Sequence, residues 1–491
     1  MIPLPNLARG LRRLAAAFAL ISCVAAAAQA RPATVPVVML SDIHLDPFTD
    51  PAKVAQLRIA PVAQWHSILA SADTPTQAAD FASLQRTCRS KGIDTPMPLL
   101  TSSLAAEQTQ MPHPLFVTVS GDLMAHQFDC KFKTLAPGAT EADYSVFAAK
   151  TVAFVALELK HTFPGTPIYF ALGNNDSGCK DYAEDINSAF LQGDAQSFAT
   201  DALNPANSTA ITHEFSQLGD YNIELPAPFE HKRLIVLQDI FESKRFTTCD
   251  GTPDKTAAAK QIDWLRTQLA AARAKGEHVW IMAHIPPGID AYGTFTKGAS
   301  ICTTSEPALF LNSSALGDAL AEYAATISLG LFGHTHMDEM KLLHAGSGLG
   351  VPIKLVPSIT PVNGNYPAFT VAKVDPRTAT LIDYTVYSAS NKTGISTIWS
   401  KEYTYSSTYK QPDFSAPSVS KLMVDFTADK GGSSEASKNY QNFYLVGGPS
   451  EVGISANLKA AAMQLIWHGY ACSMTEMDTT TFRTCACPTK P

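Results

Sequence analysis

Five short segments of the sequence carry aspartate, asparagine and histidine, residue types that bind divalent metal ions through oxygen and nitrogen. A carboxylate has two oxygens and can bridge two cations, whereas an asparagine offers a neutral carbonyl oxygen. In an extended chain, residues two positions apart face the same side, so an Asp-x-His or His-x-His pair can reach one cation. The side chains in question are Asp42, His44, Asp122, Asn174, His284, His334 and His336.

A predicted buried strand precedes each of these segments. The runs are apolar and rich in β-branched residues, which is typical of strands inside a sheet. The carboxyl ends of parallel strands meet at one edge of a sheet, where α/β proteins place their ligands, so we expect the seven side chains to converge. Gly121 and Gly333 would let the backbone approach the site closely. The predicted strands are residues 35–40, 114–119, 167–172, 278–283 and 327–332.

The remaining chain alternates helices and strands and then changes character. Apolar spacing predicts helices at 141–163 and 255–275, with Gly276 as the C-cap of the second. Three alternating segments, at 353–359, 368–374 and 380–387, predict antiparallel strands that complete a sheet. Beyond residue 390 the composition shifts to Ser, Thr, Tyr and Lys, and helical patches occur at 418–427 and 457–468. We therefore expect an α/β catalytic domain followed by a small helical segment that contains cysteines.

The proposed domain boundaries follow from these patterns. Residues 1–30 contain an arginine-rich start, an apolar stretch and Ala28-Gln-Ala30, which fits a signal-peptidase site. A second interpretation is that residues 20–23 form a lipobox and that Cys23 becomes an acylated anchor. The expected catalytic domain spans 31–390, in which the polar, proline-punctuated residues 48–113 are an insertion between two core strands. Residues 391–491 form the expected C-terminal region, stapled by disulfides.

Charge and cysteine content limit the class of protein. Residues 1–30 contain three arginines and no acidic residue, so their removal takes the formal net charge from −7 to −10. Such a charge argues against a nucleic acid duplex as partner, because backbone binding needs a basic face. Beyond the leader, no apolar run reaches the length of a membrane-spanning helix. Eight cysteines remain there; in an exported protein they favour up to four disulfides, although the sequence does not choose their pairing.

The motifs around the candidate ligands resemble those of the calcineurin-like metallophosphoesterase superfamily. The Asp-Ile-His-Leu-Asp-Pro motif at 42–47, Gly-Asp-x-x-x-His at 121–126 and His-Ile-Pro-Pro-Gly at 284–288 resemble, more narrowly, the acid sphingomyelinase-like phosphodiesterases. The resemblance implies a four-layer α/β/β/α sandwich. It also implies two metal sites bridged by Asp122: Asp42, His44 and His336 for the first, and Asn174, His284 and His334 for the second.

This resemblance also implies a catalytic role for His126, as an acid that protonates the departing alcohol. General acid catalysis contributes on the order of 10²- to 10⁴-fold, most for poor leaving groups. One departure concerns Asn175, where the family commonly has a histidine: an amide could orient a phosphate oxygen but could not transfer a proton. Gly-Asn-Asn-Asp at 173–176 is also similar to endopolyphosphatases. Asn175 and Tyr292 are candidate substrate-binding residues, although ordinary packing is the alternative for both.

The sequence thus predicts a secreted or periplasmic hydrolase that cleaves phosphodiesters with two divalent metal ions, either zinc or, alternatively, Mn or Fe. The two cations would lower the pKa of a shared water, so that hydroxide attacks phosphorus near neutral pH. The core begins close to the predicted cleavage site and leaves no room for a lipid-presenting module, which favours a soluble small-molecule phosphodiester or nucleotide. One alternative is a polyphosphatase or nucleotide pyrophosphatase, and another is a non-catalytic binding protein. The sequence does not predict the oligomeric state.

Overall fold

The computed structural model describes residues 34–295, 302–303, 305–345, 348–447 and 454–487. Within these ranges the strands form two six-stranded sheets, ordered β12-β11-β10-β1-β2-β3 and β4-β5-β6-β7-β9-β8. The strands are β1 Val35–Leu40, β2 Phe116–Ser120, β3 Ile168–Ala171, β4 Tyr221–Glu224, β5 Lys232–Val236, β6 His278–Met282, β7 Ile327–Phe332, β8 Glu339–His344, β9 Gly350–Leu355, β10 Ala368–Asp375, β11 Thr380–Ala389 and β12 Trp399–Thr404.

Parallel pairing joins the five predicted strands within the two sheets, where β3 lies at the edge of the first sheet and the other four lie inside. In the first sheet β2 lies parallel to both β1 and β3, and in the second β6 lies parallel to both β5 and β7. All residues of β2 and β3 are buried, as expected for parallel strands covered on both faces. The carboxyl ends of these strands carry the motifs identified in the sequence.

The three segments at 353–359, 368–374 and 380–387, predicted to complete one sheet as antiparallel strands, do not all join the same sheet. This part of the prediction was wrong. β9 belongs to the second sheet, parallel to β7 and antiparallel to β8. β10 and β11 join the first sheet, where β10 pairs antiparallel with β1. The connection after β9 crosses between the sheets. The Val356 amide donates to the carbonyl of Phe332 on β7 of the second sheet, and the Thr360 amide donates to the carbonyl of Asp42, just after β1 of the first sheet. Alternation identifies a strand with one polar face but does not identify the sheet it joins.

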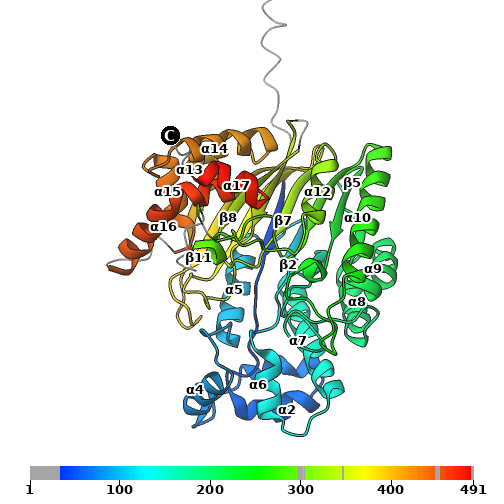
Figure 1. Ribbon diagram of the computed structural model, residues 1–491. Helices are drawn as coiled ribbons and strands as arrows, with labels where there is room; N and C mark the ends of the chain where they lie inside the picture. Colours follow the sequence, from blue (N-terminus) through cyan, green and yellow to red (C-terminus); the bar gives the residue numbers. More distant parts are fainter. Residues whose placement is uncertain (1–33, 296–301, 304, 346–347, 448–453, 488–491) are drawn as a thin grey trace, which may run out of the picture. The chain divides into compact units, whose positions relative to one another are not determined.

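Helices cover the strands in the described part of the chain, and Figure 1 shows α8, α9 and α10 together on one flank. The predicted helices at 141–163 and 255–275 correspond to α7 and α10, and Gly276 is the left-handed C-cap of α10. The α-helices are α2 Val54–Ile59, α3 Trp65–Leu69, α4 Gln77–Thr87, α5 Met97–Gln110, α6 Phe128–Leu135, α7 Glu141–Thr162, α8 Ala189–Asp201, α9 Pro205–Leu218, α10 Thr256–Lys275, α11 Ala291–Phe295, α12 Ala315–Glu322, α13 Tyr405–Tyr409, α14 Ala416–Ala428, α15 Glu435–Phe443, α16 Ile454–Ser473 and α17 Thr479–Ala486.

Three short 3₁₀ helices also occur in the described part of the chain. The connection between β1 and β2 contains two of them, together with α2 to α5 and the loops that join these helices. The 3₁₀ helices are η1 Pro51–Lys53, η2 Val62–Gln64 and η3 Asp239–Glu242. Residues 48–113 lie in the connection between β1 and β2, which are adjacent and parallel; that they form an insertion stays a prediction. The expected signal peptide, its cleavage site and Cys23 lie outside the described residues.

Aromatic side chains join the inner faces of the two sheets. The ring of Phe116 on β2 lies 5.8 Å from that of Trp280 on β6, and the indole of Trp280 donates a 2.7 Å hydrogen bond to the Ala379 carbonyl. On an outer face, Phe170 of β3 stacks on Phe198 of α8 at 4.5 Å. Two sheets with helices outside them confirm the predicted α/β sandwich.

Disulfides connect distant parts of the described chain. The pairs are Cys88–Cys130, Cys179–Cys249, Cys302–Cys487 and Cys472–Cys485. All eight cysteines outside the predicted leader are therefore paired, as the even count favoured. Structural disulfides are typical of proteins that work in oxidising compartments. Within the described ranges, no helix combines the length and the apolar composition needed to cross a bilayer.

Candidate metal centre

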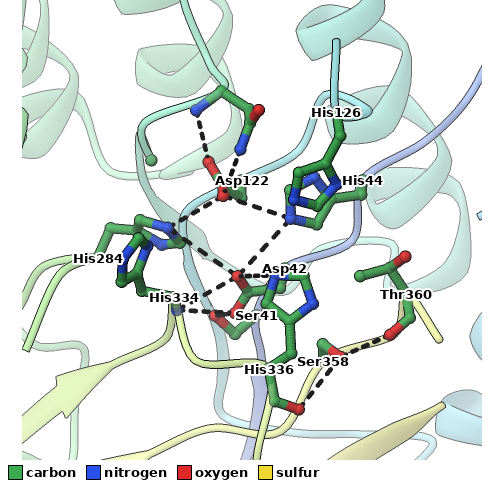
Figure 2. A network of polar contacts seen from close by, with 12 residues as sticks. Ser41, Asp42, His44, Asp122, His126, His284, His334, His336, Ser358 and Thr360 are labelled. Carbon is green, nitrogen blue, oxygen red and sulfur yellow. Dashed lines mark hydrogen bonds and ion pairs between the residues drawn. The ribbon is translucent and has the colours of Figure 1, made fainter. Parts of the chain in front are cut away.

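Two aspartates form the middle of the centre, and histidines from both sheets surround them (Figure 2). Asp42 follows β1 and Asp122 follows β2. Nε2 of His336 lies 3.3 Å from Asp42 Oδ1, while Nε2 of His44 and of His284 lie 3.3 and 3.1 Å from Asp122 Oδ2. Ligand atoms of Asp42, His44, Asp122 and His336 all lie within 4.8 Å of one another. The strand ends thus converge as the sequence predicted.

Backbone carbonyls orient two of the histidines. Nδ1 of His44 lies 2.7 Å from the Met124 carbonyl, and Nδ1 of His284 lies 2.8 Å from the Ser120 carbonyl. Because a carbonyl only accepts, each Nδ1 donates, and Nε2 is the ring nitrogen that faces the aspartates and binds a cation in its deprotonated form. Such a hydrogen bond on the outer nitrogen fixes tautomer and ring orientation in metal-binding histidines.

His334 lies in the same cluster, and Asn174 follows β3, the neighbour of β2. The His334 ring stands perpendicular to the His284 ring at 5.1 Å, and its backbone amide donates to Asp42. The side-chain amide of Asn174 donates to Asp181 Oδ1 at 2.8 Å, which leaves the Asn174 carbonyl oxygen as the group that faces elsewhere. All seven predicted ligands are therefore positioned by the ends of β1, β2, β3, β6 and β7.

A divalent cation fits the donor set. Among the candidate ligands in the described part of the chain, four buried side-chain atoms form no hydrogen bond: Nε2 of His44, Nε2 of His284, Nδ1 of His336 and Oδ1 of Asn174. Buried polar atoms normally have partners, and an orphaned one signals a missing ligand or a cost of about 1–3 kcal/mol. Neutral imidazole, carboxylate and amide oxygen together suit Zn, Mn or Fe.

Left-handed backbone conformations concentrate at this centre. Asp42, His44, Asp122, His334 and His336 have φ of 47°, 46°, 55°, 72° and 67°. Non-glycine residues with positive φ are uncommon, and each costs of order 1–3 kcal/mol unless its surroundings enforce it. Five of the seven candidate ligands share this feature, which is the kind of strain that accumulates at functional sites.

Glycines beside the ligands make room for them. A Cβ on Gly121 would lie 2.7 Å from His284 Nδ1, and one on Gly333 would collide with Ser41 Oγ and lie 2.6 Å from Asp42 Oδ2. Neither position therefore accepts a side chain without displacing a candidate ligand. This bears out the expectation that Gly121 and Gly333 allow a close approach.

Burial and charge set the ionisation of the cluster. Burial raises the pKa of Asp42, but nearby imidazoles, first that of His336, outweigh it and lower this pKa to about 2. Burial lowers the pKa of His334 and of His336 to about 3 each. For His284, the charge of Asp122 overcomes burial and raises the pKa to about 10. Near neutral pH the carboxyl of Asp42 is thus ionised, and His334 and His336 have the neutral form that binds cations.

His126 lies against the cluster with its side chain 26% exposed. Its ring stacks on the His44 ring at 4.1 Å. Asp94 accepts hydrogen bonds from the His126 backbone amide and from Nδ1, both at 2.9 Å. Burial raises the pKa of Asp94, but His126 and Lys131 outweigh it and hold that pKa well below its usual range. Asp94 therefore fixes Nδ1 as a donor and leaves Nε2 as the other nitrogen of the ring.

Asn175 contacts the candidate bridging carboxylate. Its backbone amide donates to Asp122 Oδ1 at 2.8 Å, and its side-chain amide donates to Oδ2 at 2.9 Å. Tyr292 lies in α11 with 75% of its surface exposed. Substrate binding by either residue stays a prediction.

The sequence patterns did not single out Asp94, Asp181 or Arg245. Arg245 donates a hydrogen bond to Asp181, which in turn accepts one from Asn174. Asp94 comes from the connection between β1 and β2, and Asp181 and Arg245 come from two other loops. No spacing rule relates these positions to the strand-end motifs. The only local signal was the unusual Gly-Asn-Asn-Asp block, which lies a few residues before Asp181.

Residues 35–338 match the calcineurin-like phosphoesterase family. The chain belongs to this family and is a metal-dependent phosphoric ester hydrolase. It is similar to acid sphingomyelinase-like phosphodiesterase 3b of Homo sapiens, with 26% identity over 412 residues and 80% of each chain covered. It is also similar to cyclic GMP-AMP phosphodiesterase SMPDL3A of Mus musculus, with 23% identity over 349 residues, 68% of this chain and 71% of the relative. Among solved structures, a dimetal phosphatase from Danio rerio aligns with a TM-score of 0.38 and 13% identity, over 76% of this chain and 100% of that one.

Proposed function

We propose that the protein is an exported phosphodiesterase that uses two divalent metal ions, zinc in the first instance, to hydrolyse soluble phosphodiesters or nucleotides. The observation that carries the proposal is the convergence of unpartnered nitrogens and oxygens on Asp42 and Asp122, with His126 beside them. Curated relatives named phosphodiesterases support the diester as substrate, and the four disulfides support export.

In this proposal the residues divide into three roles. Asp42, His44 and His336 would hold the first cation, Asn174, His284 and His334 would hold the second, and Asp122 would serve both. When bound, two cations supply charge stabilisation at phosphorus and a nucleophile at neutral pH. Asn175 holds the Asp122 carboxylate in one orientation through its two hydrogen bonds.

His126 donates a proton to the leaving oxygen. Nδ1 is committed to Asp94, so Nε2 is the nitrogen that carries the transferred proton. The partly exposed ring lies between the cluster and solvent, where a departing alcohol can receive that proton. The ionised Asp94 stabilises the charged imidazole before transfer, in the way that a carboxylate orients a catalytic histidine in hydrolases.

The test combines metal analysis with a substrate panel. The purified protein is assayed on bis-p-nitrophenyl phosphate, p-nitrophenyl phosphate, ATP, polyphosphate and sphingomyelin, together with His126→Ala. Two metals per chain, a preference for diesters and a larger loss in His126→Ala on poor leaving groups are expected. Orthophosphate release from polyphosphate without diester cleavage would instead favour a polyphosphatase, and a folded protein that binds no metal would overturn the proposal.

A further inference from the structure

Arg245 lies on the loop that follows η3, and its contacts lead to two of the candidate ligands, His334 and Asn174. Its guanidinium carbon is 4.0 Å from the centroid of the Tyr182 ring, and the Tyr182 hydroxyl is 3.5 Å from His334 Nε2. Tyr182 is buried, with 6% of its surface exposed, whereas the side chain of Arg245 is 64% exposed. The Arg245 guanidinium therefore covers one face of the Tyr182 ring, and the hydroxyl at the end of that ring contacts the candidate ligand His334.

A second contact ties Arg245 to the same centre. One nitrogen, Nη2, donates to Asp181 Oδ2 at 2.9 Å, while Asp181 Oδ1 accepts from the Asn174 side chain at 2.8 Å. A guanidinium has five N–H donors in a planar fork, and a single bond to Asp181 engages one of them. The contacts to Tyr182 and Asp181 fix the plane of the group, which lowers the entropic cost of binding an anion.

Arg245 is not needed to hold its loop in place. The Cys179–Cys249 disulfide joins the two loops covalently. Backbone hydrogen bonds from Thr247 to Tyr182 at 3.1 Å and from Glu184 to Thr247 at 3.2 Å join them again. The exposed ion pair adds little stability, because solvent and salt screen the attraction between exposed charges. The Arg245 guanidinium is therefore oriented at the edge of a phosphoesterase site without being required to hold its loop in place.

We propose that Arg245 binds a second phosphate group of the substrate, so that the enzyme selects nucleotides that carry a phosphate in addition to the scissile diester. The inference rests on the proposed function, since it presumes that the scissile phosphate occupies the metal centre. Arg245 contributes to binding and leaves the chemical step to the centre itself. Carboxylate and phosphate oxygens both match two parallel N–H bonds from a guanidinium, and phosphate is the one that a nucleotide supplies.

The experiment compares two chromogenic esters that share one scissile bond. Thymidine 5′-(p-nitrophenyl phosphate) has only the diester, whereas its 3′-phosphorylated form adds a second phosphate. In Arg245→Gln, the KM for the 3′-phosphorylated ester is expected to rise about tenfold, since the second phosphate loses its charge-assisted hydrogen bonds. Its kcat is expected to stay within twofold, and both constants for the plain ester are expected to stay unchanged.

Two further variants sharpen the comparison. Lys244→Gln removes an equal charge from the neighbouring exposed position and is expected to leave both esters unaffected. Arg245→Lys keeps the charge without the fork and is expected to recover part of the lost affinity.

Two outcomes overturn the inference: equal losses on both esters, which show a purely structural role, or no loss on either. If the wild-type protein hydrolyses neither ester, the proposed function fails. Calorimetric binding of thymidine 3′,5′-bisphosphate to wild type and Arg245→Gln then decides the role of Arg245 separately. A tenfold weaker affinity in the variant supports that role, and equal affinities refute it.

Discussion

Asn175 holds both oxygens of Asp122, one through its backbone amide and one through its side chain, at 2.8 and 2.9 Å. The side-chain bond is the part that mutation can remove, because the backbone amide persists in any variant except proline. Asn175, which stands where the resembled family commonly has a histidine, thus directly supports Asp122, the carboxylate expected to contact both cations.

Asn175→Ala is expected to weaken metal binding by about 10- to 100-fold, the usual cost of losing a partner that orients a ligand. Metal content after dialysis against graded chelator concentrations measures this change. Asn439→Ala, on α15 and remote from the motifs in the sequence, serves as the control. Equal retention of metal by wild type and Asn175→Ala would contradict the role given to this side chain.

Gly333→Ala is expected to abolish metal retention, because its Cβ would collide with Ser41 and Asp42. The matched variant is Gly193→Ala, in α8, where a Cβ meets nothing within 4 Å. That change is expected to raise the free energy of unfolding by about 0.5–1 kcal/mol, as alanine is the better helix former. Metal analysis and thermal unfolding of both variants test the pair, and full metal loading of Gly333→Ala would refute the steric argument.

Asp94→Asn is expected to lower turnover about 100-fold on diesters with poor leaving groups. The neutral amide no longer stabilises a protonated His126. The loss should shrink on p-nitrophenyl esters, whose leaving group needs little protonation, and metal content should not change. Asp80→Asn, an exposed position in α4 of the same insertion, is the control. A uniform loss across leaving groups would indicate a structural role for Asp94.

Glu107 on α5 gives a prediction for stability against pH. Its carboxyl oxygens are buried and form no hydrogen bond within the described residues, and burial raises its pKa to about 8. The folded state therefore keeps a proton that the unfolded state releases near pH 4.5. Because the folded state binds more protons, the free energy of unfolding falls as pH rises from about 4.5 to about 8, by at most about 1.4 kcal/mol per pH unit.

Glu107→Gln should remove this contribution, so the stability of the variant relative to wild type should be higher at pH 8 than at pH 5. Urea unfolding of wild type and variant at both pH values measures the difference. Glu435→Gln, at an exposed position of α15, should leave the pH dependence unchanged. Parallel pH profiles for wild type and Glu107→Gln would show that Glu107 is ionised in the folded state.

The strand-end motifs were predictable because each combines a local strand signal with residues of fixed chemistry. Asp42 and His336, nearly 300 positions apart, meet because parallel strands deliver their carboxyl ends to one edge. Asp94, Asp181 and Arg245 were not predictable, since they come from loops whose positions depend on the packing of the whole sheet. The prediction for β9 failed for a related reason. Residues 356–360 cross between the sheets, and the two backbone hydrogen bonds that hold this crossing are not encoded in any local pattern.

The position of β1 has a consequence for the order of folding. This first strand lies between β2 and β10, and Val35 pairs with Val374. The first sheet therefore cannot close until nearly the whole catalytic region has emerged from the ribosome or from a translocation channel. Contacts between such distant residues slow folding, because the loop entropy is lost before the pairing compensates for it. Until then β1 exposes an unpaired edge, so the nascent chain depends on being kept from aggregation while its two ends are still apart.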